Sequence, residues 1–189
     1  NHIGDCTMST LFVNNLNTAS GTTITVPTGK KLVGTDSASI YAPGMVVQVT
    51  NLASTPISGR LESSSTSFVA SNLEGSITPK FSNSKINVRF ASTINTNTDS
   101  NHMVVYTIYR KIGSGSYSNL RNTSGHYGIG HVQGTDRVQC PMIAEIVDTP
   151  NTTSAVTYKV YARSVHGITF ELPSTQEEHL ECVITEIAQ

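Results

Sequence analysis

The stretch that decides the fold reads GSITPKFSNSKINVRF and covers residues 75–90. Over 85–90 the apolar residues Ile, Val and Phe alternate with Lys, Asn and Arg. Because successive side chains of a strand point to opposite faces, this period of two predicts a β-strand with one buried face. Pro79, which has no backbone N–H donor, and the small polar cluster at 82–84 predict a turn immediately before that strand.

The same arrangement of turn and strand recurs along the chain. In DTPNTTSAVTYKVYARS (148–164), Pro150 and the polar run at 151–154 predict a turn, and the alternation that starts at Val156 predicts a strand with one buried face. The stretch HMVVYTIYRK (102–111) is apolar on both faces, which is typical of a sandwich centre or a subunit interface. We therefore predict an all-β fold, an antiparallel jelly-roll-like β-sandwich.

The composition supports an exposed β protein and excludes several classes of function. Hydrophobic residues make up 37%, charged residues 13%, and 23 Ser and 25 Thr fill much of the remainder. The formal net charge of −1 lacks the basic surplus of a nucleic-acid-binding protein, so we predict no nucleic-acid partner. No segment is apolar enough for a membrane helix, which predicts no membrane insertion. The three cysteines, an odd count without CxxC spacing, are predicted to be buried free thiols.

The first 43 residues differ from the rest of the chain. Turn residues recur every six to ten positions there, and large side chains are too few to form a core. Short β-rich runs, among them KKLVG at 30–34, predict a β-rich stalk or trimerisation connector, with a flexible linker as the alternative reading. The Pro43–Gly44 pair marks the predicted boundary with a β-sandwich domain at 44–189.

Four segments, in order and with similar gaps, carry a resemblance to a known group of proteins. They are APGMVVQV (42–49), TSFVASNLEGSITPKFSNSKINVRF (66–90), DTPNTTSAVTYKVYARS (148–164) and VITEIAQ (183–189). Together they resemble the C-terminal β module of tail-fibre, spike or appendage structural proteins of tailed phages of the marine and cyanophage type. This resemblance covers about residues 42–189. It implies a homotrimeric virion component, located on an external appendage or surface of the virion and produced in the host cytoplasm.

The candidate contact residues lie in the long polar, glycine-rich passage at 110–139, since long ordered loops in compact domains are often functional. Tyr117, Arg121, His126 and Tyr127 are the predicted receptor-contact residues. An alternative is a metal site in this passage, with His126, His131 and Asp136 as its ligands. An ordinary surface loop is the simpler reading, and we predict no metal, no cofactor and no catalytic residue.

The resulting hypothesis is a non-enzymatic structural component of a phage virion that contacts other virion proteins and displays its sandwich to the host surface. A glycan-binding receptor-recognition domain is the first alternative, with a host cell-surface glycan as the partner. A capsid decoration protein is the second. A glycosidase, which needs two carboxylates flanking the scissile bond, has no support in the spacing of the acidic residues.

Overall fold

The structure is a computed structural model, and it divides the chain into two units, Asn1–Gly34 and Thr35–Gln189. The described part of the first unit includes no strand within this single chain, and Leu32 and Val33 in the run at 30–34 are 68% and 74% exposed. The stalk or trimerisation connector, whose strands would pair between subunits, stays a prediction. The residues that the structure describes are 26, 28–34, 40, 42–52, 59–97, 100–121, 128–173 and 181–189.

The second unit is built from strands, and its described residues contain no helix. The strands are β1 (Val46–Leu52), β2 (Leu61–Ser63), β3 (Val69–Ile77), β4 (Lys85–Thr96), β5 (His102–Ile112), β6 (Ser118–Asn119), β7 (Gly130–Gly134), β8 (Val138–Asp148), β9 (Val156–Ser164), β10 (Phe170–Leu172) and β11 (Glu181–Ile187).

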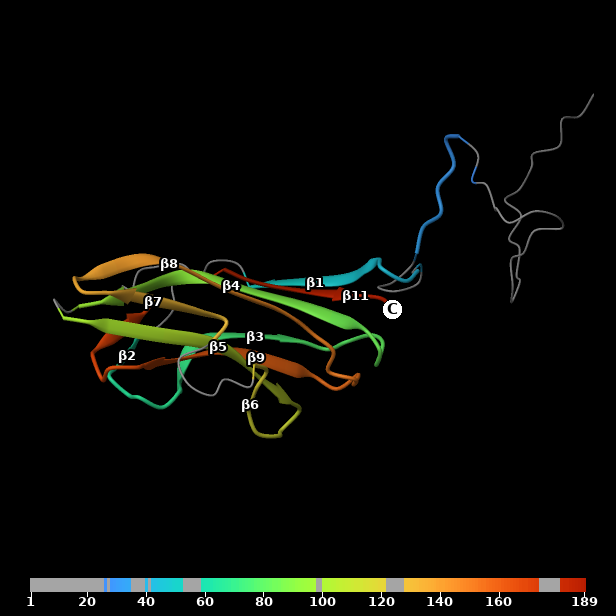
Figure 1. The fold of residues 1–189 in the computed structure, drawn as a ribbon. Coiled ribbons are helices and arrows are strands. Elements are labelled where there is room, and N and C mark those ends of the chain that lie inside the picture. Colours follow the sequence, from blue (N-terminus) through green and yellow to red (C-terminus); the bar gives the residue numbers. More distant parts are fainter. Residues whose placement is uncertain are drawn as a thin grey trace, which may run out of the picture. The chain divides into compact units, whose positions relative to one another are not determined.

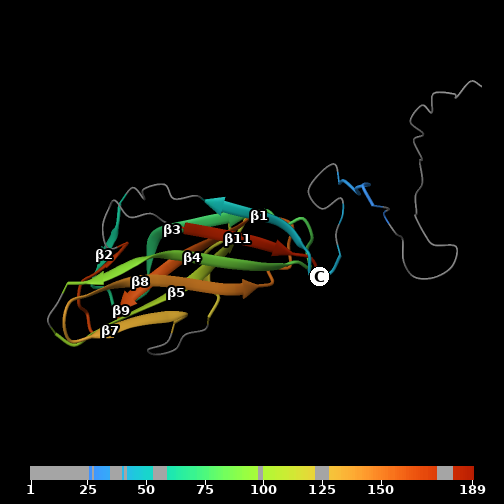
Figure 2. The same cartoon turned by 90° about the horizontal axis from the view of Figure 1, so that it is seen from above.

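These strands form two antiparallel sheets packed face to face (Figure 1). Sheet I has the order β1-β11-β4-β10-β2, and β8 pairs with the other edge of β4. Figure 2 shows β1, β11, β4 and β8 side by side. Sheet II has the order β3-β9-β5-β6, and β7 also pairs with β5. The pairs β1/β11, β3/β9, β4/β8 and β5/β7 are nested in the sequence, which is the topology of a jelly roll and confirms the predicted fold class.

The alternation in the sequence corresponds to burial between the sheets. The apolar positions of β4 that precede its midpoint, Ile86, Val88 and Phe90, are fully buried. In β9 the residues from Val156 to Ala162 alternate in the same way, and the apolar face is again fully buried. The core therefore consists of the inward face of each sheet, as the period of two predicts.

Strand β5 is buried on both faces, as predicted. A later segment of the same chain covers part of its outward face. The N–H of Ile129 donates to the carbonyl of Tyr106 at 2.9 Å. Gly128 lies so close to β5 that a Cβ there would collide with the Tyr106 carbonyl and the Val105 side chain. The long glycine-rich passage thus folds back onto sheet II through β6 and β7, so the burial of β5 requires no second subunit.

The turn at 78–84, between β3 and β4, is held by a buried carboxylate from the last strand. Glu186 is 0% exposed and accepts hydrogen bonds from the backbone N–H groups of Lys80 (2.8 Å) and Phe81 (3.1 Å). The Ser84 hydroxyl donates at 2.7 Å, and the side-chain amide of Gln48 at 2.6 Å. Because four donors meet one carboxylate, the polar turn and the C-terminal strand stabilise each other.

A β-bulge between Val46 and Gln48 makes this contact possible. It shifts the register so that Gln48 pairs with Glu186 on the inward face, while Val46 and Val49, three residues apart, both lie opposite outward residues of β11. Burial alone would raise the pKa of Glu186. The hydrogen bonds from Ser84, Lys80, Gln48 and Phe81 outweigh it, so that this pKa lies below its ordinary value.

Candidate functional site

The outward face of sheet II carries a group of aromatic and charged side chains, which we call the tyrosine face. The alternation of β9 that buries Tyr158 and Val160 turns Lys159, Tyr161 and Arg163 outward. Strand β5 adds the outward residues Tyr109 and Lys111. The segment before β3 adds the ring of Phe68, and the segment before β6 adds the ring of Tyr117. The tyrosine face consists of Phe68, Glu74, Tyr109, Lys111, Tyr117, Lys159, Tyr161 and Arg163.

The four rings form a continuous series of contacts. Tyr109 and Tyr161 are stacked, with ring centroids 3.9 Å apart and an interplanar angle of 21°. Phe68 meets Tyr109 edge-on at 6.1 Å, and Tyr117 lies tilted against Tyr161 at 5.9 Å. The separations of 6.1 and 5.9 Å fall within the range of roughly 4.5–7 Å that is favourable for aromatic pairs, and the stacked pair Tyr109–Tyr161 is closer than that range. Segments far apart in the sequence therefore build one aromatic surface.

The charged groups of this face are arranged around the rings. Glu74 forms an ion pair with the Lys159 amine at 2.7 Å and accepts a hydrogen bond from the Tyr117 hydroxyl at 2.8 Å. The Lys111 amine lies 5.0 Å from the centroid of the Tyr117 ring, and the Arg163 guanidinium 5.2 Å from that of Phe68. These distances are those of cation–π contacts.

The pKa shifts at this face follow from the same contacts. Burial alone would raise the pKa of Glu74, but hydrogen bonds from Lys159 and Tyr117 lower it below its ordinary value. Burial, and then the Glu74 carboxylate, raises the pKa of Tyr117. At neutral pH the face therefore presents an ionised Glu74, which accepts, and a protonated Tyr117, which donates.

The predicted contact residues separate in the structure. Tyr117 belongs to the tyrosine face, and His126 and Tyr127 lie outside the described residues. Arg121 instead lines an open pocket of about 570 Å³ together with residues of β8. The other aromatic residues of the tyrosine face lie outside the predicted loop. The available signal for Tyr161 was its outward position in a strand with one apolar face, whereas Tyr109 lies in a stretch that is apolar on both faces and gave no such signal.

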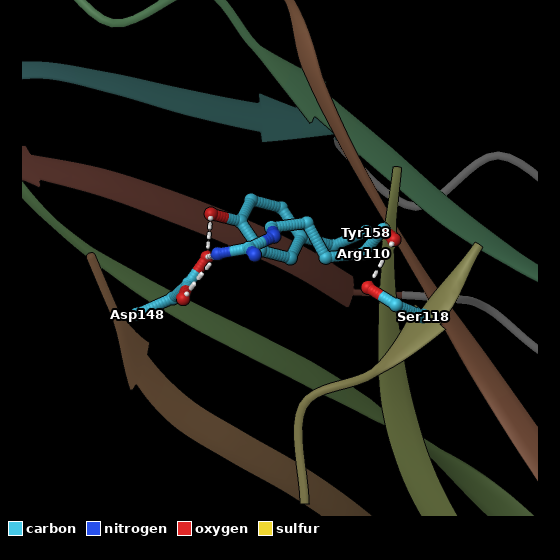
Figure 3. Close-up of polar contacts among 4 residues, drawn as sticks. All are labelled: Arg110, Ser118, Asp148 and Tyr158. Carbon is cyan, nitrogen blue, oxygen red and sulfur yellow. Dashed lines mark hydrogen bonds and ion pairs between the residues drawn. The ribbon is translucent and has the colours of Figure 1, made fainter. Parts of the chain in front are cut away.

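A second polar cluster joins the two sheets (Figure 3). The Arg110 guanidinium, on β5 of sheet II, donates to both oxygens of Asp148, on β8 of sheet I, at 2.9 and 3.0 Å. The hydroxyl of the fully buried Tyr158 donates to the same carboxylate at 2.9 Å. Burial, and then the charge of Asp148, raises the pKa of Tyr158. Since the three groups satisfy one another and the Ser118 hydroxyl bonds the Arg110 carbonyl at 3.3 Å, the cluster is a structural link between the sheets.

The described part of the chain contains no disulfide, no group of side chains that could hold a metal ion and no helix that could span a membrane. Cys140 and Cys182 are free thiols, and burial raises the pKa of Cys182 to about 12, while Cys6 lies outside the described residues. No group of three or more His, Cys, Asp or Glu side chains among the described residues could hold a metal ion. The same residues include no helix that is long and apolar enough to cross a membrane.

The fold and this surface define a jelly-roll β-sandwich with one aromatic, cationic outer face. No family model matches the chain, and no curated protein matches it. Among solved structures, the chain is similar to one described as "Structure of infectious bursal disease virus Gx strain", with 10% sequence identity and a TM-score of 0.43. That similarity covers 82% of this chain and 36% of the other, so the chain spans little more than a third of the length of the protein it matches.

Proposed function

We propose that this chain is a non-enzymatic structural component of a phage virion, of the tail-fibre, spike or appendage kind, which assembles as a homotrimer. The observation that carries the proposal is the difference between the outer faces of the two sheets. In the described residues of the sandwich unit from Ala42 onward, the exposed large apolar side chains all lie on the strands β1 and β8 of sheet I or directly before β1. They are Met45, Val46, Val49, Ile143 and Val147.

The register places these apolar residues on a single face. Val147 lies opposite Asn87, Asn87 opposite Thr185, and Thr185 opposite Val49, so that one row crosses four strands. The inward residues of β4 and β11 alternate with Asn87 and Thr185 and are buried. The row therefore points outward, with apolar residues on the edge strands β1 and β8 and the polar Asn87 and Thr185 between them. Exposed apolar areas such as these two are typical of protein interfaces.

The outward face of sheet I carries charges of both signs. Arg89 pairs with Glu181 at 3.3 Å. The exposed Lys85, on the same side of β4, is opposite in sign to Glu145, which accepts a hydrogen bond from the Asn87 amide at 3.2 Å. A face with little net charge can pack against copies of itself without the repulsion that like charges would cause. This supports association between identical chains.

The two apolar areas lie on opposite edges of sheet I, and this favours a ring. We propose that β1 of one copy packs against β8 of the next, which is a head-to-tail contact. Head-to-tail contacts close into cyclic oligomers when the rotation between copies allows it. The number of three copies, the location on the virion exterior and the contact with other virion proteins rest on the resemblance of residues 42–189 to phage appendage modules.

Light scattering tests this assembly. The full chain has a mass of 20.2 kDa, and we expect a solution mass three times as large. The double substitution Val49→Lys and Val147→Lys should lower the mass toward that of one chain, because it introduces unpaired charges into the interface. Its circular dichroism should not change, since both side chains are more than half exposed.

The matched control is Gln133→Lys, an exposed position on β7 in sheet II, which should leave the mass unchanged. A stable single-chain mass for the unaltered protein would contradict the trimer. A capsid decoration domain would then be the better description.

A further inference from the structure

We propose that the tyrosine face, defined above as Phe68, Glu74, Tyr109, Lys111, Tyr117, Lys159, Tyr161 and Arg163, binds an acidic oligosaccharide. This inference rests on the proposed function, because it assigns a ligand class to the face that the assembly leaves outward. The binding chemistry itself lies within one chain.

The charged side chains of the tyrosine face indicate that its ligand is an anion. The face contains three cationic side chains and one carboxylate, although acidic residues slightly outnumber basic ones over the whole chain. Glu74 neutralises Lys159 at 2.7 Å. The Lys111 amine lies above the Tyr117 ring and is attracted by Glu74, but among the described residues it forms no direct ion pair. An anionic group of a ligand would therefore find a positively charged partner in Lys111.

The aromatic rings indicate a sugar as the rest of the ligand. A sugar ring presents C–H groups on one face, and these pack against aromatic rings, while its hydroxyl groups form hydrogen bonds at the edge. Glu74, whose side chain is 40% exposed, can accept from such hydroxyls, and the neighbouring Lys159 amine can donate to them. An aromatic ring next to a carboxylate and an amine thus fits a polyhydroxylated ligand better than an apolar one.

The extent of the ring series indicates an oligosaccharide. Successive ring centroids are 6.1, 3.9 and 5.9 Å apart from Phe68 through Tyr109 and Tyr161 to Tyr117. The four rings come from four segments of the chain, so a ligand of several linked sugars can contact more of them than a single sugar can. The rings are already in contact with each other and with the cations, so little side-chain freedom is lost on binding.

A single-stranded nucleic acid would also combine negative charge with stacking, but the charge balance does not favour it. Nucleic-acid grooves follow the phosphate backbone with a continuous basic surface. Here one of the three cations is neutralised by Glu74, and the chain carries a formal net charge of −1. An acidic sugar, which needs one cation for each acidic group, is the better match.

Binding of the full chain to an immobilised panel of oligosaccharides tests the inference. The panel contains uronic-acid, sialylated and sulfated oligosaccharides, neutral oligosaccharides of equal length, and a single-stranded oligonucleotide. We expect capture of at least one acidic oligosaccharide and at least tenfold weaker capture of its neutral counterpart. Added salt should weaken the binding, because the contact with Lys111 is solvent-accessible.

Two variants locate the site. Lys111→Gln should weaken acidic-oligosaccharide binding at least tenfold, whereas Lys85→Gln, which removes an exposed charge from sheet I, should leave it unchanged. Equal binding by the unaltered chain and Lys111→Gln would overturn the assignment. So would capture of the oligonucleotide alone, or no capture of any acidic oligosaccharide at millimolar concentration.

Light scattering on the same samples separates this inference from the proposed function. A trimer that captures no acidic oligosaccharide would overturn the ligand assignment and leave the proposed assembly standing. A single chain that captures one would overturn the assembly and leave the ligand site intact.

Discussion

Replacing Glu186 with glutamine should lower the free energy of unfolding by about 2–4 kcal/mol, since it removes a buried charge that several donors surround. The glutamine NH₂ group would face at least one of the donors that now point at the carboxylate, among them the N–H groups of Lys80 and Phe81 and the hydroxyl of Ser84. For a chain of this size the melting temperature should fall by about 5–10 °C, measurable by thermal circular dichroism.

The control for this substitution is Glu181→Gln on the same strand. Glu181 is 55% exposed and pairs with Arg89 at 3.3 Å, so its loss should cost less than about 1 kcal/mol. Equal effects of the two substitutions would contradict the stabilising role of Glu186.

The pH dependence of stability should reveal the same carboxylate. Because the pKa of folded Glu186 lies below its ordinary value, its contribution is fully present above the pKa of the unfolded chain. This contribution is lost as the pH falls through the folded pKa. Denaturant titrations from neutral to acidic pH should therefore show a decline that is smaller in Glu186→Gln, and an unchanged slope would contradict the assignment.

Asp148→Asn should lower the free energy of unfolding by about 2–4 kcal/mol, because it leaves the guanidinium of Arg110 without its carboxylate between the two sheets. The side chains of Arg110 and Asp148 are 23% and 9% exposed, so water replaces the lost contact poorly. Tyr158→Phe removes one hydrogen bond to the same carboxylate and should cost about 1 kcal/mol. Urea denaturation measures both values.

Glu62→Gln is the matched control for Asp148→Asn. Glu62 pairs with Arg60 at 3.0 Å but is 54% exposed, and Arg60 keeps a second partner in Glu171. The expected loss is below about 1 kcal/mol. In a double-mutant cycle, Arg110 and Asp148 should show a coupling energy well above that of Arg60 and Glu62, and coupling near zero would contradict the link between the sheets.

Several elements could be predicted from the sequence because their signals are local. The alternation over 85–90 and 156–162 predicted β4 and β9 with the correct buried face. The proline-containing turns at 78–84 and 149–155 end and restart strands where expected. The short strand β2 carries few residues, and its pairing with β10, distant in the sequence, defines it. The two-residue strand β6 is defined by its pairing with the nearby strand β5.

The candidate site was less accessible to sequence reasoning. Tyr117 was predicted as a contact residue from its loop, but Phe68, Tyr109 and Tyr161 come from other segments. Their proximity depends on β9 lying between β3 and β5, an order that no local pattern specifies.

By itself, the sequence determined the class of fold, because side-chain alternation and turn residues act within a few positions of the chain. Only the tertiary structure decided which groups meet. Glu186 reaches the turn before β4 across more than a hundred residues, and Asp148 joins Arg110 from the opposite sheet. Such contacts depend on strand order and register, which are set by the packing of both sheets together and not by the residues on either side of each group.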